Sequence, residues 1–293
     1  MSTNGEIAAL DVDDDSDAAG RLAGRRWLYR SWLTSLGTFL LLLATIEACI
    51  RGFDIPSYIF PAPSEIILAL YKGFAAPLLS QSAYYTHLLT TLTEALSSFA
   101  IGTVLGIALG AAIAEFPILR RLLLPYVIGL QSVPKVALAP LFVVWFGLGI
   151  SSKIVLGVLL TFFPLMVNTI AGFASVEKDR LELMQSLKSS PWKTFRYVKL
   201  PSALPFIFAG LEMAAAYSVL GAVVGEFVGG TRGLGVLMLN RNAALDIAGS
   251  MAALVLLAVL GITLQKVVAI ARNRLLFWAP SKDVLQNPEP RQD

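Results

Sequence analysis

Six apolar stretches, each long enough to cross a lipid bilayer, occupy most of this 293-residue chain and limit its possible folds more than any other feature. The hydrocarbon core of a bilayer is about 30 Å thick, and a helix crosses it with about 20 apolar residues. The sequence therefore predicts an all-α integral membrane protein with six transmembrane helices. They are expected near residues 32–50, 88–114, 122–148, 154–173, 203–228 and 247–270.

The composition agrees with a membrane protein. Hydrophobic residues make up 56% of the chain and charged residues only 15%, which exceeds what a soluble core needs. Basic residues lie beside the apolar stretches rather than among exposed aromatic residues, so we expect membrane lipid as a partner and no nucleic acid. The single Cys49 excludes a disulfide within the chain.

The distribution of basic residues predicts the topology. An even number of spans leaves both termini on one side, and Lys and Arg concentrate in cytoplasmic segments. They gather before the first span, between the fourth and fifth, and after the sixth. We therefore expect both termini in the cytoplasm. Residues 1–28 are expected to form a disordered tail without a cleaved targeting segment, 29–275 the membrane domain and 276–293 a C-terminal tail.

Two spans carry glycines at every fourth position, which lets helix backbones approach closely in lipid. This spacing indicates either packing within one subunit or a seam between two subunits. In addition, a short helix with Ser64 as its N-cap is expected outside the membrane. The glycines are Gly102, Gly106 and Gly110 in the second span, and Gly221, Gly225 and Gly229 in the fifth.

Enzymatic sites are not expected. His87 is the only histidine, so a zinc site of the His-Glu-x-x-His kind cannot form, and we expect His87 at a membrane interface. The loop 147–153 lacks the Gly before Lys153 that a phosphate-binding loop requires. We therefore expect no catalytic, metal or cofactor site in this chain.

The segment 182–201 is charged, although it lies between two apolar spans. Leu181, Met184 and Leu187 share one helical face, and the pattern stops at residues 189–191. Ser190 is suited to cap a second short helix over 192–198, with Pro191 in its first turn and Leu200-Pro201 at its end. An apolar face opposite a basic face favours either docking into a groove of a partner protein or binding flat on the lipid surface.

The same segment resembles the cytoplasmic signature of bacterial ABC importer permeases, which reads Glu-Ala-Ala, three residues, Gly, nine residues, an aliphatic residue, any residue, Leu-Pro. Glu182, Val198 and Leu200-Pro201 match it, whereas Leu183-Met184 replace the two alanines and Lys188 replaces the glycine. A break at 189–191, one residue later, is expected instead. Further stretches resemble the nitrate, sulfonate and taurine branch: 60–64 (FPAPS), 133–147 (VPKVALAPLFVVWFG), 163–169 (FPLMVNT) and 225–228 (GEFV).

This resemblance, over about residues 55–278, implies a type I ABC importer permease fold in the bacterial inner membrane. It implies a homodimer on two cytosolic ATPase subunits that bind ATP and Mg²⁺, with an extracytoplasmic solute-binding protein. The cargo would be a small organic or anionic solute, of the sulfonate, taurine, nitrate or heteroaromatic precursor type. The alternative is a secondary transporter driven by an ion gradient. The resemblance makes 182–201 the ATPase-coupling segment, with Glu182, Met184, Leu187, Lys188, Pro191, Trp192, Leu200 and Pro201 as its site residues.

Lys135 is a cation in the third span, directly after Pro134, which breaks the helix. A charge within a span is expensive and indicates function. Two alternatives remain open: Lys135 lines the pathway of an anionic solute, or it forms a buried ion pair with Glu212 or Glu226. The residues expected to line the pathway are Gln131, Ser132, Lys135, Asn168 and Glu226.

Overall fold

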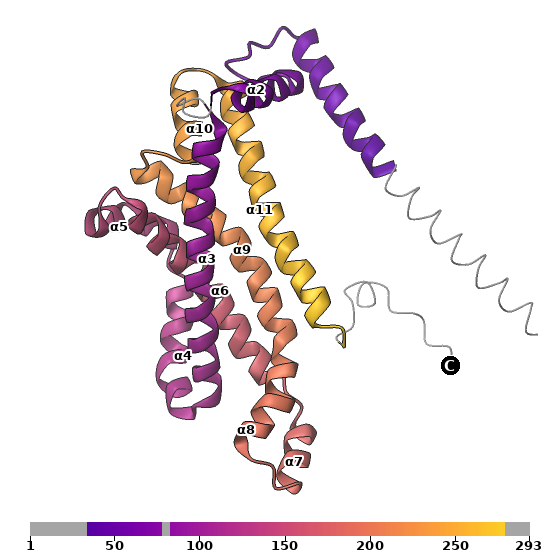
Figure 1. The fold of residues 1–293 in the computed structure, drawn as a ribbon, viewed down its shortest axis with the longest axis vertical. Coiled ribbons are helices and arrows are strands. Elements are labelled where there is room, and N and C mark those ends of the chain that lie inside the picture. The colour runs from indigo at the N-terminus through magenta and orange to yellow at the C-terminus, as the bar shows by residue number, and fades with distance from the viewer. Residues whose placement is uncertain (1–33, 78–82, 279–293) are drawn as a thin grey trace, which may run out of the picture. The chain divides into compact units, whose positions relative to one another are not determined.

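The computed structural model describes residues 34–77 and 83–278 (Figure 1). It divides into two compact units, residues 1–67 and 68–293, which are described separately. The predicted N-terminal tail and residues 279–293 of the predicted C-terminal tail lie outside the described residues. Leu276, where the tail was expected to begin, is buried against Phe208 and Val268.

The first unit contains the apolar helix Thr34–Gly52 and the beginning of α2 (Pro63–Ala75). Ser64 is not the N-cap that we expected, because the helix already begins at Pro63. Ser64 instead donates its backbone N–H and its hydroxyl to Glu47, at 3.0 and 2.7 Å. The Glu65 carboxylate accepts the N–H of Ala62 at 3.2 Å, as in a capping box.

The second unit is built around α6, which packs along α3 and along α9 (Figure 1). Its short helices α7 and α8 lie at one end of the unit and α10 at the opposite end. The elements that follow α2 are α3 (Tyr84–Glu115), α4 (Pro117–Gln131), a 3₁₀ turn (Lys135–Leu138), α5 (Ala139–Phe146), α6 (Ile150–Ala174), α7 (Lys178–Ser186), α8 (Pro191–Thr194), a π-helical turn (Phe195–Lys199), α9 (Leu200–Gly229), α10 (Leu234–Ala243) and α11 (Ile247–Leu275).

Five helices in the described part of the chain are long and apolar enough to cross a membrane. A sixth span results if α4 and the segment Lys135–Phe146 are counted as one span, bent by 87°. The break lies at Pro134, as the sequence predicted, because proline has no N–H to continue the helix. The predicted all-α fold is confirmed for the described residues, with five spans, or six if the bent pair is one span.

The glycines of α3 lie against α6 within the same chain. A Cβ atom at Gly102 would meet the Thr161 side chain, and one at Gly110 would meet Thr169 and the Met166 carbonyl. On the other side of α6, Gly221 of α9 faces the backbone of Gly157. The glycine spacing therefore serves packing within one subunit, which is one of the two alternatives left by the sequence.

We expected the helix that begins at Pro191 to end at Leu200-Pro201, but it continues beyond these residues. It passes through a π-helical turn, in which the Leu200 N–H bonds the Phe195 carbonyl, and continues as α9. Pro201 follows the π-helical turn directly, at the second residue of α9. As a result, 39 residues from Pro191 to Gly229 form one helical element.

Candidate functional site

The segment 182–201 contains the end of α7, a tight turn and the start of the long helical element that begins with α8. α7 ends in a Schellman motif, in which Ser189 N–H bonds the Met184 carbonyl at 3.0 Å and Lys188 N–H bonds the Gln185 carbonyl at 2.8 Å. Lys188 adopts the left-handed conformation, with φ of 49°. The turn therefore occurs at the position where the family signature has glycine, and not one residue later as we expected.

The second short helix begins as predicted. The Ser190 hydroxyl accepts the backbone N–H of Lys193 at 3.4 Å, and Pro191 occupies the first turn. This cap satisfies an N–H that the first turn of a helix otherwise leaves without a partner. It also fixes the direction in which the chain leaves the turn at Lys188.

Large apolar side chains of this segment point into solvent. Leu187 is 67% exposed and Trp192 is 70% exposed. Both belong to the predicted coupling set, and large exposed apolar groups beside basic residues are typical of a protein-binding surface. A groove of about 430 Å³ also involves residues of this segment and is lined by Arg180, Leu183, Met184, Tyr197, Val198, Pro201, Ser202, Pro205 and Trp278.

Two contacts connect this surface to the membrane helices. Trp192 stacks on Phe195 with ring centroids 5.8 Å apart, and Phe195 stacks on Phe173 at the end of α6. Lys199 forms an ion pair with Glu115, at the end of α3, with 2.7 Å between Nζ and Oε2. The segment therefore contacts α6 through the stacked rings and α3 through the ion pair.

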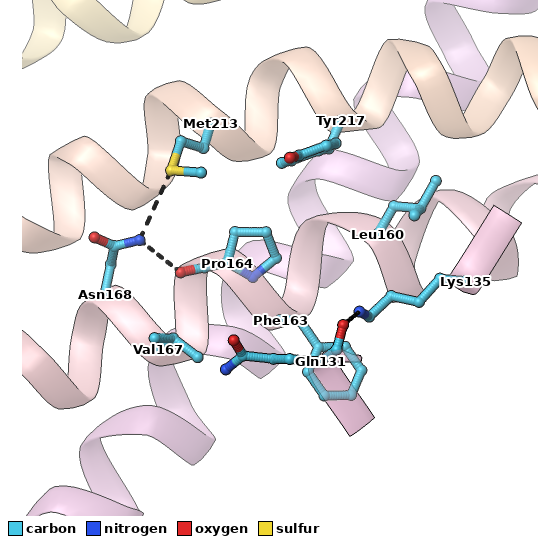
Figure 2. Close-up of a pocket in the computed structure, with 9 residues that line it drawn as sticks. All are labelled: Gln131, Lys135, Leu160, Phe163, Pro164, Val167, Asn168, Met213 and Tyr217. Carbon is cyan, nitrogen blue, oxygen red and sulfur yellow. Dashed lines mark hydrogen bonds between the residues drawn. The ribbon is translucent and has the colours of Figure 1, made fainter. Parts of the chain in front are cut away.

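A second feature is a cavity of about 330 Å³ between α4, the 3₁₀ turn, α6 and α9 (Figure 2). Three of the predicted pathway residues, Gln131, Lys135 and Asn168, line it. Ser132 caps the end of α4 beside the cavity but is not one of its lining residues. The other lining residues are Leu160, Phe163, Pro164, Val167, Met213 and Tyr217.

Lys135 carries the one formal charge of the cavity lining. Its Nζ donates to the Gln131 carbonyl at 3.2 Å and lies 4.7 Å from the centre of the Phe163 ring (Figure 2). A cation over an aromatic face is stabilised by the charge distribution of the ring. Within the described residues Lys135 has no carboxylate partner at ion-pair distance.

The carboxylates considered as partners of Lys135 are engaged elsewhere. Glu212 forms an ion pair with Arg272, with Oε1 2.7 Å from Nη1. Glu226 is buried and accepts hydrogen bonds from Thr91 and from the backbone of Gly235, so it lies in a different cluster from the cavity. The ion-pair alternative for Lys135 is therefore wrong for both candidates.

The cavity wall also depends on Pro164 within α6. Pro164 has no N–H to bond the Leu160 carbonyl, and the amide of Asn168 donates to the Pro164 carbonyl at 2.8 Å. The Asn168 amide also reaches Met213 Sδ at 3.9 Å, which links α6 to α9 (Figure 2). Polar groups thus line this cavity beside aromatic rings.

Sequence reasoning missed a buried ion pair. Lys153 Nζ lies 2.9 Å from Glu94 Oε1, and both side chains are almost completely buried. His87 was expected at an interface but is buried, with Nδ1 2.8 Å from the Gly233 carbonyl oxygen. The sequence did contain one signal for the ion pair: Glu94 is an acidic residue within a predicted span, where a charge needs a partner.

The chain is similar to known transport proteins. A family described as "binding-protein-dependent transport system inner membrane component" matches residues 102–275. The riboflavin transport system permease protein RibX of Chloroflexus aurantiacus is 34% identical over 83% of this chain and 89% of its own length. The formylaminopyrimidine transport permease protein ThiX of Halalkalibacterium halodurans is 35% identical over 82% and 93%. The taurine transport system permease protein TauC of Escherichia coli is 30% identical over 86% and 92%.

Solved structures support the fold. The chain matches an inward-facing MetNI methionine ABC transporter with a TM-score of 0.53 at 20% identity, over 74% of this chain and 98% of that one. It matches an amino acid ABC transporter with a TM-score of 0.54 at 15% identity, over 72% and 96%. The chain has the type I importer permease fold and belongs to the family of binding-protein-dependent inner-membrane transport components, the permease subunits of ABC importers, in which a separate ATPase hydrolyses ATP.

Proposed function

We propose that this permease moves a small organic anion, and that the cavity at Lys135 is part of the pathway. The observation that supports this proposal is a lysine without a carboxylate partner in a membrane-embedded cavity with two aromatic residues, Phe163 and Tyr217. An anionic group of the solute would bind the ammonium group, and an aromatic or apolar part would contact the rings.

The named cargoes of the relatives each agree with one part of this chemistry, either the aromatic rings or the anionic group. They include aromatic solutes, riboflavin and a formylaminopyrimidine, and the small sulfonate taurine. The aromatic lining and the two relatives at 34% and 35% identity favour a heteroaromatic solute with an acidic group over an aliphatic sulfonate.

The assembly is proposed as follows. Leu187 and Trp192 insert into a groove of the ATPase, which alone binds ATP and Mg²⁺, and two copies of the permease form a homodimer. Both termini and the loop that contains α7 are proposed to be cytoplasmic. The gathering of Lys and Arg residues between 178 and 199 supports this orientation.

Replacing Lys135 with Met tests the pathway. The variant keeps the length and apolar bulk of the side chain but removes its charge, so we expect an assembled complex that hydrolyses ATP and takes up an anionic solute at least tenfold more slowly. The measurement is uptake into vesicles that contain the complex. Lys266→Met, at a different cavity of α9 and α11, is the matched control and should transport normally. Normal uptake by Lys135→Met would rule out this pathway.

A further inference from the structure

Three ionisable side chains meet in the interior of the second unit. Glu94 comes from α3, Lys153 from α6 and Glu226 from α9, and their exposed fractions are 0%, 3% and 1%. Two carboxyl groups and one ammonium group would carry a net negative charge if all three were ionised. An uncompensated charge in a dry interior is strongly unfavourable. The cluster therefore needs one more positive charge or a proton.

Glu226 has the surroundings of an ionised carboxylate. Thr91 donates its hydroxyl to Oε1 at 2.6 Å, and the Gly235 N–H reaches Oε2 at 2.5 Å. Gly235 lies in the first turn of α10, where the helix dipole favours a negative charge. Both oxygens of Glu226 thus accept hydrogen bonds, and we assign the negative charge to this residue.

Glu94 is different. Its Oε1 accepts from Lys153 Nζ at 2.9 Å, but no donor among the described residues reaches its Oε2, although that atom is buried. The carboxyl group of Glu226 lies in the same cluster, because Thr91, one turn before Glu94 on α3, donates to Glu226, and Lys153 packs against Gly225, the neighbour of Glu226. Two carboxylates side by side repel, whereas a carboxylic acid beside a carboxylate forms a strong hydrogen bond.

We propose that Glu94 is a proton-binding site: it holds a proton on Oε2 and donates it to the Glu226 carboxylate. The proton satisfies the one unpartnered oxygen and leaves Lys153 and Glu226 as a balanced pair of charges. This inference is independent of the proposed transport function, because it uses only the geometry of the cluster. Charged or titratable groups that face Glu94 are Lys153 from α6 and Glu226 from α9. His87, on α3 itself, contacts the Gly233 carbonyl.

The proton would hold a specific part of the fold in place. Glu226 and Thr91 bind the backbone N–H groups of Gly235 and Leu234, and His87 contacts Gly233. These bonds fix the turn between α9 and α10 to α3, at the end of the unit opposite α7 and α8 (Figure 1). Loss of the proton would place two negative charges beside this turn and weaken its attachment.

Replacing Glu94 with Gln distinguishes a proton from an ordinary ion pair. The Gln amide donates to Glu226 and its carbonyl accepts from Lys153, so it reproduces protonated Glu94. We expect the full-length permease in detergent to melt within about 2 °C of the wild type at pH 7. If Glu94 is ionised, the same variant loses a buried charge from the pair with Lys153, and its melting temperature falls strongly, which would overturn the proposal.

The pH dependence gives a second readout. If Glu94 holds this proton in the folded chain, unfolding at neutral pH releases it, so the stability of the wild type falls as the pH rises. Glu94→Gln has no proton to lose, so its melting temperature should fall less between pH 7 and pH 9. Parallel curves for the two proteins would contradict the proposal.

Two controls complete the test. Glu94→Ala removes donor and acceptor together, so it should melt well below the wild type, and unchanged melting would rule out the role of Glu94 in holding the turn. Infrared spectroscopy of protein with ¹³C-labelled Glu should show a carboxylic acid band at pH 7 that Glu94→Gln lacks. Absence of this band from the wild type, or melting that depends on Na⁺ at constant ionic strength, would indicate a bound cation in place of the proton.

Discussion

Phe195 stacks on Phe173, with ring centroids 5.5 Å apart and ring planes inclined by 14°. Phe173 is the buried partner, at the end of α6, and Phe195 belongs to the π-helical turn that follows α8. The pair is a direct contact between the surface proposed for ATPase docking and a helix that lines the cavity.

Breaking this contact should uncouple hydrolysis from transport. Phe195→Leu keeps an apolar side chain but removes the stacking, which is worth about 0.5–1.5 kcal/mol. We expect normal assembly and ATP hydrolysis, with several-fold fewer solute molecules moved per ATP. Phe227→Leu, at the opposite end of α9, is the matched control. An unchanged ratio of uptake to hydrolysis in Phe195→Leu would show that the stack transmits nothing.

Charges on the exposed surface should prevent docking. Leu187→Asp and Trp192→Asp place a charge where an interface would remove water, at a cost of several kcal/mol. Because both side chains are exposed, the permease itself should still insert and fold. The measurement is co-purification of the permease with the ATPase, and we expect both variants to lose it. Gln185→Asp adds the same charge at an exposed polar position of α7 and should assemble normally. Intact complexes of the Leu187 and Trp192 variants would instead favour the alternative in which this surface binds lipid.

The left-handed conformation of Lys188 should cost stability. A residue with a Cβ atom is less favourable than glycine there by about 1 kcal/mol. Lys188→Gly should therefore raise the melting temperature of the permease by a few degrees. Lys193→Gly, in the short helix α8, should lower it, because glycine is unfavourable in a helix. If Lys188→Gly melted at a lower temperature than Lys193→Gly, the left-handed turn at Lys188 would be excluded.

The seam between α6 and α9 should not accept larger side chains. Gly221→Val would press a side chain against the backbone of Gly157, so we expect a loss of several kcal/mol and low yield of folded protein. Gly261→Ala provides the contrast, since nothing lies within 4 Å of the position where its Cβ would be. This variant should be neutral or slightly more stable. Equal yields from both variants would contradict the close packing.

The sequence predicted features that depend on neighbouring residues. Span length, the break at Pro134 and the cap at Ser190 follow from local backbone chemistry, and all three are confirmed. The left-handed turn at Lys188 was missed because glycine was taken as a requirement there. Hydrogen bonding of the neighbouring residues, which forms the Schellman motif, outweighs the modest strain of a lysine in this conformation.

Features that depend on distant residues were harder to predict. Glu94 and Lys153 are 59 positions apart, and no local pattern indicates that α3 and α6 bring them together. The same holds for Glu226, which was assigned to the pathway on its charge alone. In contrast, Gln131, Lys135 and Asn168 were predicted together from polarity within spans, and the structure places all three at one cavity.

The π-helical turn between α8 and α9 has a mechanical consequence. It lets the chain pass Pro201 without a break, so the 39-residue helix from Pro191 to Gly229 extends over about 60 Å. Trp192 lies at one end of this helix, whereas Met213 and Tyr217, farther along it, form part of the cavity wall. A displacement imposed at Trp192 therefore passes to the cavity wall along one helical element, through the π-helical turn and past Pro205.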